Sequence, residues 1–181
     1  MRDLAKNPWD HLCLLKMDAS GTHFKQWPEK GREPTSELST HLAVHDMLIR
    51  TKSTKKALVH THATELIALT QIREFCSTEA LNRLLWSMHP EIIMFNPEGL
   101  GFIPYELPGT SGIADATAKA LEDHPVALWE KHGVIATGKS ITEAFDTIDI
   151  LAKSARIFFL VKNAGYEPEG LTDEQLNELM S

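Results

Sequence analysis

Two histidines stand two residues apart in the segment LVHTHATELIALT, residues 58–70, where a short apolar run gives way to a helix-like pattern. Because residues i and i+2 of an extended strand face the same side, His60 and His62 project together. Two imidazoles so placed suit one divalent cation such as Zn²⁺. The alternative is two unrelated polar residues at the end of a strand, and the pair alone does not decide between them.

A catalytic zinc needs a third protein ligand and an open position for water or substrate. His132 is the best candidate, because it lies in the segment WEKHG, residues 129–133, between two apolar extended runs. Gly133 would let the backbone come close to an ion. Taken alone, His132 could equally be an exposed loop histidine, but together with His60 and His62 it favours a metal site.

His41 and His45 compete for this role, since their i, i+4 spacing on a predicted helix is also a metal-ligand geometry, and Glu37 extends the same face. No second segment with histidine or cysteine pairs with them better than with His60 and His62. We therefore interpret both as structural residues or as neighbours of the ligands. The remaining histidines lie in surface-like settings and are assigned no role: His11, His23, His89 and His124.

Two carboxylates are candidates for work beside a metal. Glu37 lies at the predicted first turn of a helix, where the positive end of the helix dipole favours a carboxylate. It is either a helix-start charge or a general base. Glu91, which precedes the apolar run 92–95, is either a surface charge or a second carboxylate of the site. Spacing does not choose between these readings.

Composition narrows the class of protein. The chain has 181 residues, of which 43% are hydrophobic and 24% charged, with a net charge of −7. This balance argues against nucleic-acid and anionic-membrane partners, because no basic stripe is present. Cys13 and Cys76 belong to no C-x-x-C pair, and no secretory signal or membrane-length apolar run occurs, so we expect a cytoplasmic protein with reduced thiols.

Strand-like and helix-like patterns intermingle, which predicts an α/β layered domain. We expect a hairpin of 11–16 and 22–27 around the turn 18–21. Ser140 and Glu143 have capping-box spacing at the start of a helix with one apolar stripe up to Phe159. The other predicted helices are 35–50, 64–72, 78–86, an Ala-rich segment between 112 and 125, and a last one from 172; the predicted strands are 57–60, 92–95, 101–103, 126–129 and 133–136.

Several of these segments resemble the signature segments of the class II aldolase/adducin family. The likeness covers nearly the whole chain from about Asp10 to Ala164. The H-x-H-A-T motif with a later W-x-x-H-G is specific to the family, and the L-I-A-L-T run favours its rhamnulose-1-phosphate aldolase branch. The segments that carry the resemblance are 34–38, 60–70, 85–91, 107–110, 128–133 and 142–149.

The resemblance implies a single domain over residues 1–181, folded as a three-layer αβα sandwich around a mostly antiparallel sheet. It implies that His60, His62 and His132 hold a catalytic Zn²⁺, that Glu37 is the acid/base, and that Glu91 is a substrate-binding carboxylate near the site. The implied reaction is reversible cleavage of a phosphorylated ketose, L-rhamnulose 1-phosphate, to dihydroxyacetone phosphate and L-lactaldehyde. Zinc would stabilise the enediolate charge as a Lewis acid. A homotetramer is implied as well.

The chain departs from the family pattern at its start. Family members carry an N-terminal region whose glycine loops bind the substrate's phosphate and hydroxyls, and Met1 falls after it, so we expect an N-terminally truncated chain that binds metal with weak or no aldolase turnover. A sugar-phosphate epimerase of the same family and a non-catalytic adducin-like module are the alternatives. The three histidines and Glu37 argue against the module. Three histidines also suit Co²⁺ or other first-row ions.

Overall fold

The computed structural model describes residues 11–17, 24–27 and 33–180. Near the start, β1 (Leu14–Met17) pairs antiparallel with β2 (Phe24–Trp27), with Leu14 opposite Trp27 and Met17 opposite Phe24. The predicted hairpin is therefore present, although its first strand begins three residues later than expected. The predicted turn residues 18–21, like His23, lie outside the described residues.

A four-stranded sheet forms the centre of the molecule, in the order β3-β6-β5-β4. Its strands are β3 (Ala57–Thr61), β4 (Leu100–Ile103), β5 (Val126–Trp129) and β6 (Gly133–Gly138). β6 pairs antiparallel with both β3 and β5, whereas β4 pairs parallel with β5. Antiparallel pairing dominates the described sheet, as expected.

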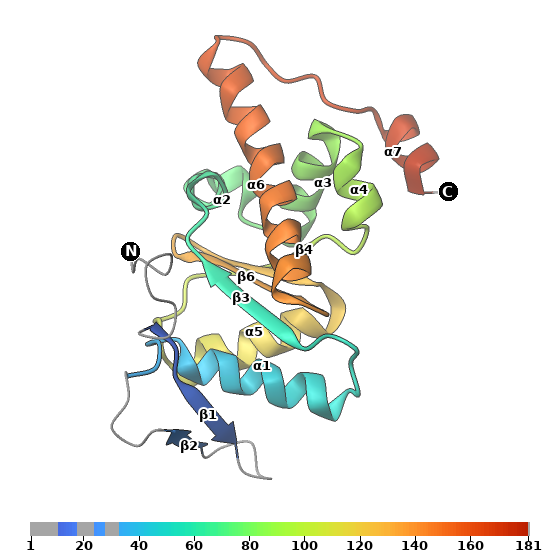
Figure 1. Cartoon of the computed structure of the whole chain (residues 1–181). Coiled ribbons are helices and arrows are strands. Elements are labelled where there is room, and N and C mark those ends of the chain that lie inside the picture. Colours follow the sequence, from blue (N-terminus) through green and yellow to red (C-terminus); the bar gives the residue numbers. More distant parts are fainter. Residues whose placement is uncertain (1–10, 18–23, 28–32, 181) are drawn as a thin grey trace.

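Helices cover both faces of this sheet (Figure 1). On one face lie α1 (Leu38–Arg50) and α5 (Ser111–Asp123), which pack against each other. The other face carries α2 (Thr64–Leu69), α3 (Thr78–Met88), α4 (Glu91–Phe95), α6 (Ile141–Asn163) and α7 (Asp173–Met180). This is the three-layer αβα arrangement that the resemblance implied.

Alternation along β5 divides the core into two clusters. Val126 and Leu128 pack into the α6 side, and Ala127 and Trp129 into the α1–α5 side. Because successive strand residues point to opposite faces, one short apolar strand serves both layers. All residues of β5 and β6 are buried, so these strands form a rigid base for the turn that joins them.

The predicted stripe of α6 is largely confirmed, since Ala144, Ile148, Leu151, Ala155 and Phe158 are buried against the sheet side. The Ser140 hydroxyl accepts a hydrogen bond from the Glu143 N–H at 3.1 Å, as a capping residue does. Two members of the predicted stripe, Ile141 and Phe145, are exposed instead. They lie in the first two turns of the helix.

The prediction of a strand over residues 92–95 is wrong, because these residues belong to α4. An apolar run this short does not distinguish strand from helix by periodicity. Pro90 immediately precedes the helix with helical backbone angles, and proline is favoured at helix starts. Ile92 and Ile93 are both buried while Met94 and Phe95 are exposed, which an alternating strand would not produce.

Two helix boundaries also differ from those predicted. α1 begins at Leu38 because residues 36 and 37 form a turn, and α2 ends at Leu69, followed by the 3₁₀ turn η2 (Arg73–Phe75). Within the described part of the chain, none of the helices combines the length and apolarity that crossing a bilayer would demand.

Candidate metal centre

Three histidines meet at one end of the central sheet. His60 is the fourth residue of β3, His62 follows the strand, and His132 lies in the turn between β5 and β6. The β3–β6 pairing, with His60 opposite Ile135, brings these segments together. One nitrogen from each ring lies within 4.8 Å of the others, and the ring centroids are 5.1 to 5.4 Å apart. Nitrogens on one tetrahedral zinc are about 3.4 Å apart, so small ring rotations suffice to close the site.

A backbone hydrogen bond orients the His60 ring. Its Nδ1 lies 3.0 Å from the Val134 carbonyl oxygen. Because a carbonyl only accepts hydrogen bonds, Nδ1 carries the proton, and the lone pair of Nε2 is left for a cation. A ligand histidine held through its other nitrogen is the usual arrangement at protein metal sites. His132 differs, because its Nδ1 is buried and has no hydrogen-bond partner among the described residues.

The surroundings favour neutral imidazoles, which is the form that binds metals. The pKa of His60 is lowered to about 4, mainly by burial and also by the nearby His62, His132 and His41, against the opposing effect of the hydrogen bond to the Val134 carbonyl. Burial also lowers the pKa of His132, while the charge of Glu37 opposes this shift. Both rings are therefore neutral at pH 7. The donor set and its unpartnered nitrogen fit a divalent cation.

The Trp129 side chain forms the inner wall of this cluster. Its rings lie 4.6 Å from the His60 ring and 4.8 Å from the His132 ring, centroid to centroid. The indole N–H donates to the Thr117 hydroxyl at 2.9 Å, which fixes the indole against α5. Sequence reasoning assigned Trp129 no role, although its place three residues before His132 was a usable signal.

Gly133 is required by the packing of the histidine rings. A Cβ atom at this position would lie 2.8 Å from His62 Cδ2, 2.9 Å from the Thr61 carbonyl oxygen and 3.0 Å from His60 Cε1. The close approach predicted for this glycine is therefore present, and it is an approach to two rings. Any larger residue would displace the candidate ligands.

Glu37 lies at the same end of the sheet as the three histidines, at the start of the helix α1. It occupies the N-cap position of α1, one residue before the helix, and is 4% exposed. Its Oε2 accepts a hydrogen bond from the Gly109 N–H at 3.3 Å, in the loop between β4 and α5. The carboxylate is near enough to His132 for its charge to raise the pKa of that ring.

The structure separates the other candidates. His41 lies next to the cluster, since it acts on the pKa of His60, while His45 stands one turn further along α1. Neither belongs to the group close enough to share one ion among the described residues. Glu91 is exposed at the start of α4, with its nearest recorded ionic neighbour, His89, 3.9 Å away. The main packing partners of α4 are α3, α6 and α7, and Glu91 is not among the described residues that group with the histidines around one possible ion.

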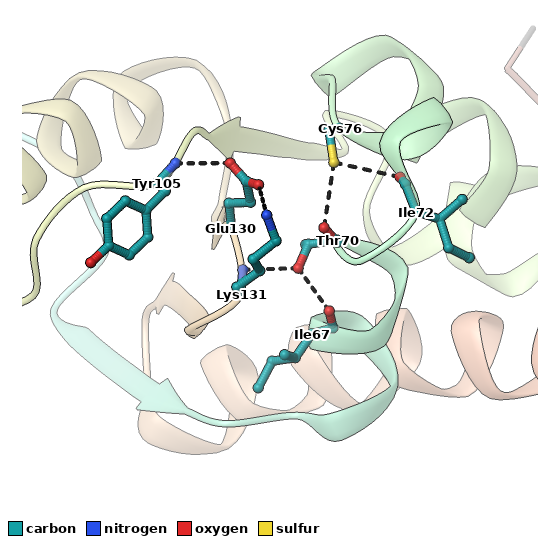
Figure 2. A network of polar contacts seen from close by, with 7 residues as sticks. All are labelled: Ile67, Thr70, Ile72, Cys76, Tyr105, Glu130 and Lys131. Carbon is teal, nitrogen blue, oxygen red and sulfur yellow. Dashed lines mark hydrogen bonds and ion pairs between the residues drawn. The ribbon is translucent and has the colours of Figure 1, made fainter.

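A polar network holds the turn that carries His132 (Figure 2). The Thr70 hydroxyl, at the end of α2, accepts from the Lys131 N–H at 2.9 Å. Glu130 contacts the Lys131 ammonium and accepts from the Tyr105 N–H at 3.0 Å. The Cys76 thiol contacts the Thr70 carbonyl oxygen at 3.4 Å. None of these residues could be assigned from spacing, because they come from four separate segments.

Comparison with known proteins agrees with this geometry. Residues 5–159 match the family model described as the Class II Aldolase and Adducin N-terminal domain. The chain is 44% identical over 179 residues to a rhamnulose-1-phosphate aldolase of Bacteroides thetaiotaomicron, covering 99% of this chain and 66% of that protein. It is 34% identical over 178 residues to the rhamnulose-1-phosphate aldolase of Pectobacterium atrosepticum, covering 97% of this chain and 65% of that protein.

The fold has solved relatives as well. A sugar-phosphate aldolase from Thermotoga maritima superposes with a TM-score of 0.80 at 35% identity, over 93% of this chain and 70% of that one. The chain thus spans just under two thirds of the length of the curated relatives it matches. The match of the family model to most of the chain, together with these identities, shows that the chain belongs to the class II aldolase and adducin family.

Proposed function

We propose that this chain is a metal-dependent aldolase that reversibly cleaves L-rhamnulose 1-phosphate to dihydroxyacetone phosphate and L-lactaldehyde. The observation that carries the proposal is the convergence of three imidazoles beside a buried carboxylate. The substrate is proposed from the similarity to rhamnulose-1-phosphate aldolases, the first of which is 44% identical.

In this proposal His60, His62 and His132 hold the metal, which we take to be Zn²⁺. When bound, the ion supplies a Lewis acid that stabilises the negative charge left by breaking the C3–C4 bond. Three neutral imidazoles leave the charge of the ion undiminished. The Val134 carbonyl and the Trp129 indole keep two of the rings in place for this task.

Glu37 moves the proton at the carbon where charge develops. The Gly109 N–H holds one carboxylate oxygen, and burial on the α1 side excludes bulk water from the group. The role that the resemblance implied for Glu91 stays a prediction; its side chain is exposed at the start of α4.

The test combines metal analysis with a product assay. The purified chain is expected to bind one Zn²⁺, to release lactaldehyde from L-rhamnulose 1-phosphate, and to lose both properties on His60→Ala substitution. An epimerised pentulose phosphate formed from a pentulose phosphate, without lactaldehyde release, would favour the epimerase. Zinc stoichiometry near zero would favour a non-catalytic module. Comparing the rate with that of a full-length relative tests the expectation of weak turnover.

We further propose that residues 1–181 form one domain of a cytoplasmic homotetramer. Support for self-association comes from large apolar side chains left exposed, including Met94, Phe95, Ile141 and Phe145. Light scattering coupled to gel filtration measures the assembly directly, and a monomer at micromolar concentration would contradict it.

A further inference from the structure

The three candidate ligands are held in different ways. His60 lies within β3 and its ring bonds to the Val134 carbonyl. His132 lies in a turn outside the strand ladder, and its buried Nδ1 has no partner among the described residues. The direction of the His132 ring therefore depends on the backbone of the turn and on the Trp129 wall.

That turn contains a backbone conformation that needs support. Lys131 has a φ of 58°, in the left-handed region that side-chain-bearing residues rarely adopt. Such conformations persist where surrounding contacts determine them. The Lys131 N–H points at the Thr70 hydroxyl, at 2.9 Å, and this bond joins the turn to the segment that follows His62 (Figure 2).

The Thr70 hydroxyl is not needed by its own helix. It donates to the Ile67 carbonyl at 2.7 Å, but the Thr70 backbone N–H already donates to that same oxygen at 3.1 Å. Since the Lys131 N–H is a donor, the hydroxyl must accept from it. Thr70 is 1% exposed, so valine would fill the same buried space. What valine could not replace is the hydrogen bond that the hydroxyl accepts from the Lys131 N–H.

We infer that Thr70 is a positioning residue of the metal centre, whose hydroxyl holds Lys131 in the left-handed conformation and thereby aims His132 at the ion shared with His60 and His62. This inference rests on the proposed function. The hydroxyl links α2, which begins two residues after His62, to the turn that carries the third ligand. The Cys76 thiol also contacts the carbonyl oxygens of Thr70 and Ile72, which further restrains the segment after α2.

The test uses three variants of the full chain. Thr70→Val removes the hydroxyl at nearly constant volume, and Thr70→Ser keeps it. Thr137→Val is the matched control, because Thr137 is also a buried threonine that donates to a backbone carbonyl, Pro125, but it lies at the opposite end of β6.

Three readouts are measured: Zn²⁺ affinity by chelator competition, hydrogen exchange of the Lys131 amide in the metal-free chain, and the absorption spectrum of the Co²⁺-loaded chain. Thr70→Val is expected to weaken Zn²⁺ binding by about 10–100-fold, in the range seen when partners of metal ligands are removed, and to speed exchange at Lys131. Thr70→Ser and Thr137→Val should stay within about threefold of the wild type. A change in the Co²⁺ absorption spectrum confined to Thr70→Val would confirm altered ligand geometry.

Unchanged Zn²⁺ affinity in a folded Thr70→Val chain would overturn the inference and leave the metal centre standing. A wild-type chain that binds no Zn²⁺ would overturn the proposed function and this inference with it, so the two failures are told apart. Should Thr70→Val not fold, Thr70→Ser decides: wild-type affinity with a protected Lys131 amide supports the inference, and a tenfold loss overturns it.

Discussion

At one end of the central sheet three imidazoles face one another, whereas at the other end acidic and basic side chains surround a cavity of about 450 Å³. At that far end, Glu122 forms an ion pair with Arg50 at 2.9 Å, and Nδ1 of His124 lies 2.7 Å from the backbone carbonyl oxygen of Glu98. At the histidine end, by contrast, the neighbouring His62 and His132 rings help burial to lower the pKa of His60. Their end of the sheet therefore suits a shared cation, while the far end combines the ammonium groups of Lys55 and Lys139 with several carboxylates, those of Glu98, Glu122, Asp123 and Glu143.

The comparison shows that three histidine rings close to one another are a better sign of a metal site than the size of a cavity is. Among the described residues no hydrogen bond joins the three rings to one another, so their free lone pairs remain available to a third species. Neighbouring charges of opposite sign pair with each other and are then less available to a ligand. At exposed positions such ion pairs also contribute little to the free energy of folding. A site of this kind must be positioned by other groups, which is the work of Val134, Trp129 and Gly133.

The largest expected effect comes from removing a ligand. His132→Ala should weaken Zn²⁺ binding by more than about 100-fold, a larger loss than removing a ligand's partner causes. The matched substitution at the far end, His124→Ala, should leave binding unchanged. Calorimetric titration of both variants measures this, and equal affinities would remove the basis for distinguishing the two ends.

Glu37→Gln should separate binding from chemistry. We expect Zn²⁺ affinity near that of the wild type but a fall in kcat of about 10²–10⁴-fold, because general acid–base catalysis contributes this much. Glu98→Gln, at the far end, is the control. Steady-state kinetics on L-rhamnulose 1-phosphate provides the measurement. A Glu37→Gln chain of undiminished kcat would exclude proton transfer by this carboxylate.

Alanine at each end of β6 tests the packing. A Cβ at Gly138 would lie 2.6 Å from the Ala144 backbone nitrogen, and one at Gly133 2.8 Å from the His62 ring. Both substitutions should lower the free energy of unfolding by about 1–3 kcal/mol, as overpacking does. Gly133→Ala alone should also weaken Zn²⁺ binding. Equal metal affinity in the two variants, with denaturation curves as the stability measure, would show that Gly133 serves only the sheet.

The smallest effect concerns pH and the metal-free chain. Burial depresses the pKa of His60 to about 4 from 6.5, so between these pH values the unfolded chain binds a proton that the folded chain does not. The free energy of unfolding should therefore fall as pH drops from 6.5 to 4, by roughly 1–2 kcal/mol after allowance for solvent screening. His62, His132 and His41 face this ring.

His60→Asn should flatten the dependence in that window, while His124→Asn at the far end should not. Chemical denaturation at several pH values, with a chelator present, gives the slopes. A wild-type stability that rises on acidification would contradict the assignment of neutral, buried imidazoles.

Much of the fold was accessible from local patterns. The period of two predicted that His60 and His62 project together, which they do although β3 ends at Thr61, and the period of 3.6 predicted the buried face of α6. Both follow from backbone geometry within a few residues, and neighbours rarely override so long a pattern. The strand predicted for residues 92–95 was wrong because the structure of so short an apolar run depends on its neighbours. Here Pro90 precedes the run and Ile92 and Ile93 pack into the core, and the segment forms a helix.

The sequence by itself determined the α/β class, the paired histidines and the family. Only the tertiary structure decided that the Glu37 carboxylate acts on His132 and that the Thr70 hydroxyl accepts a hydrogen bond from the Lys131 N–H. The physical reason is that sequence spacing fixes the relative positions of residues only within one helix or strand. Contacts between residues of different elements depend on strand register and on how helices pack over both faces of the sheet.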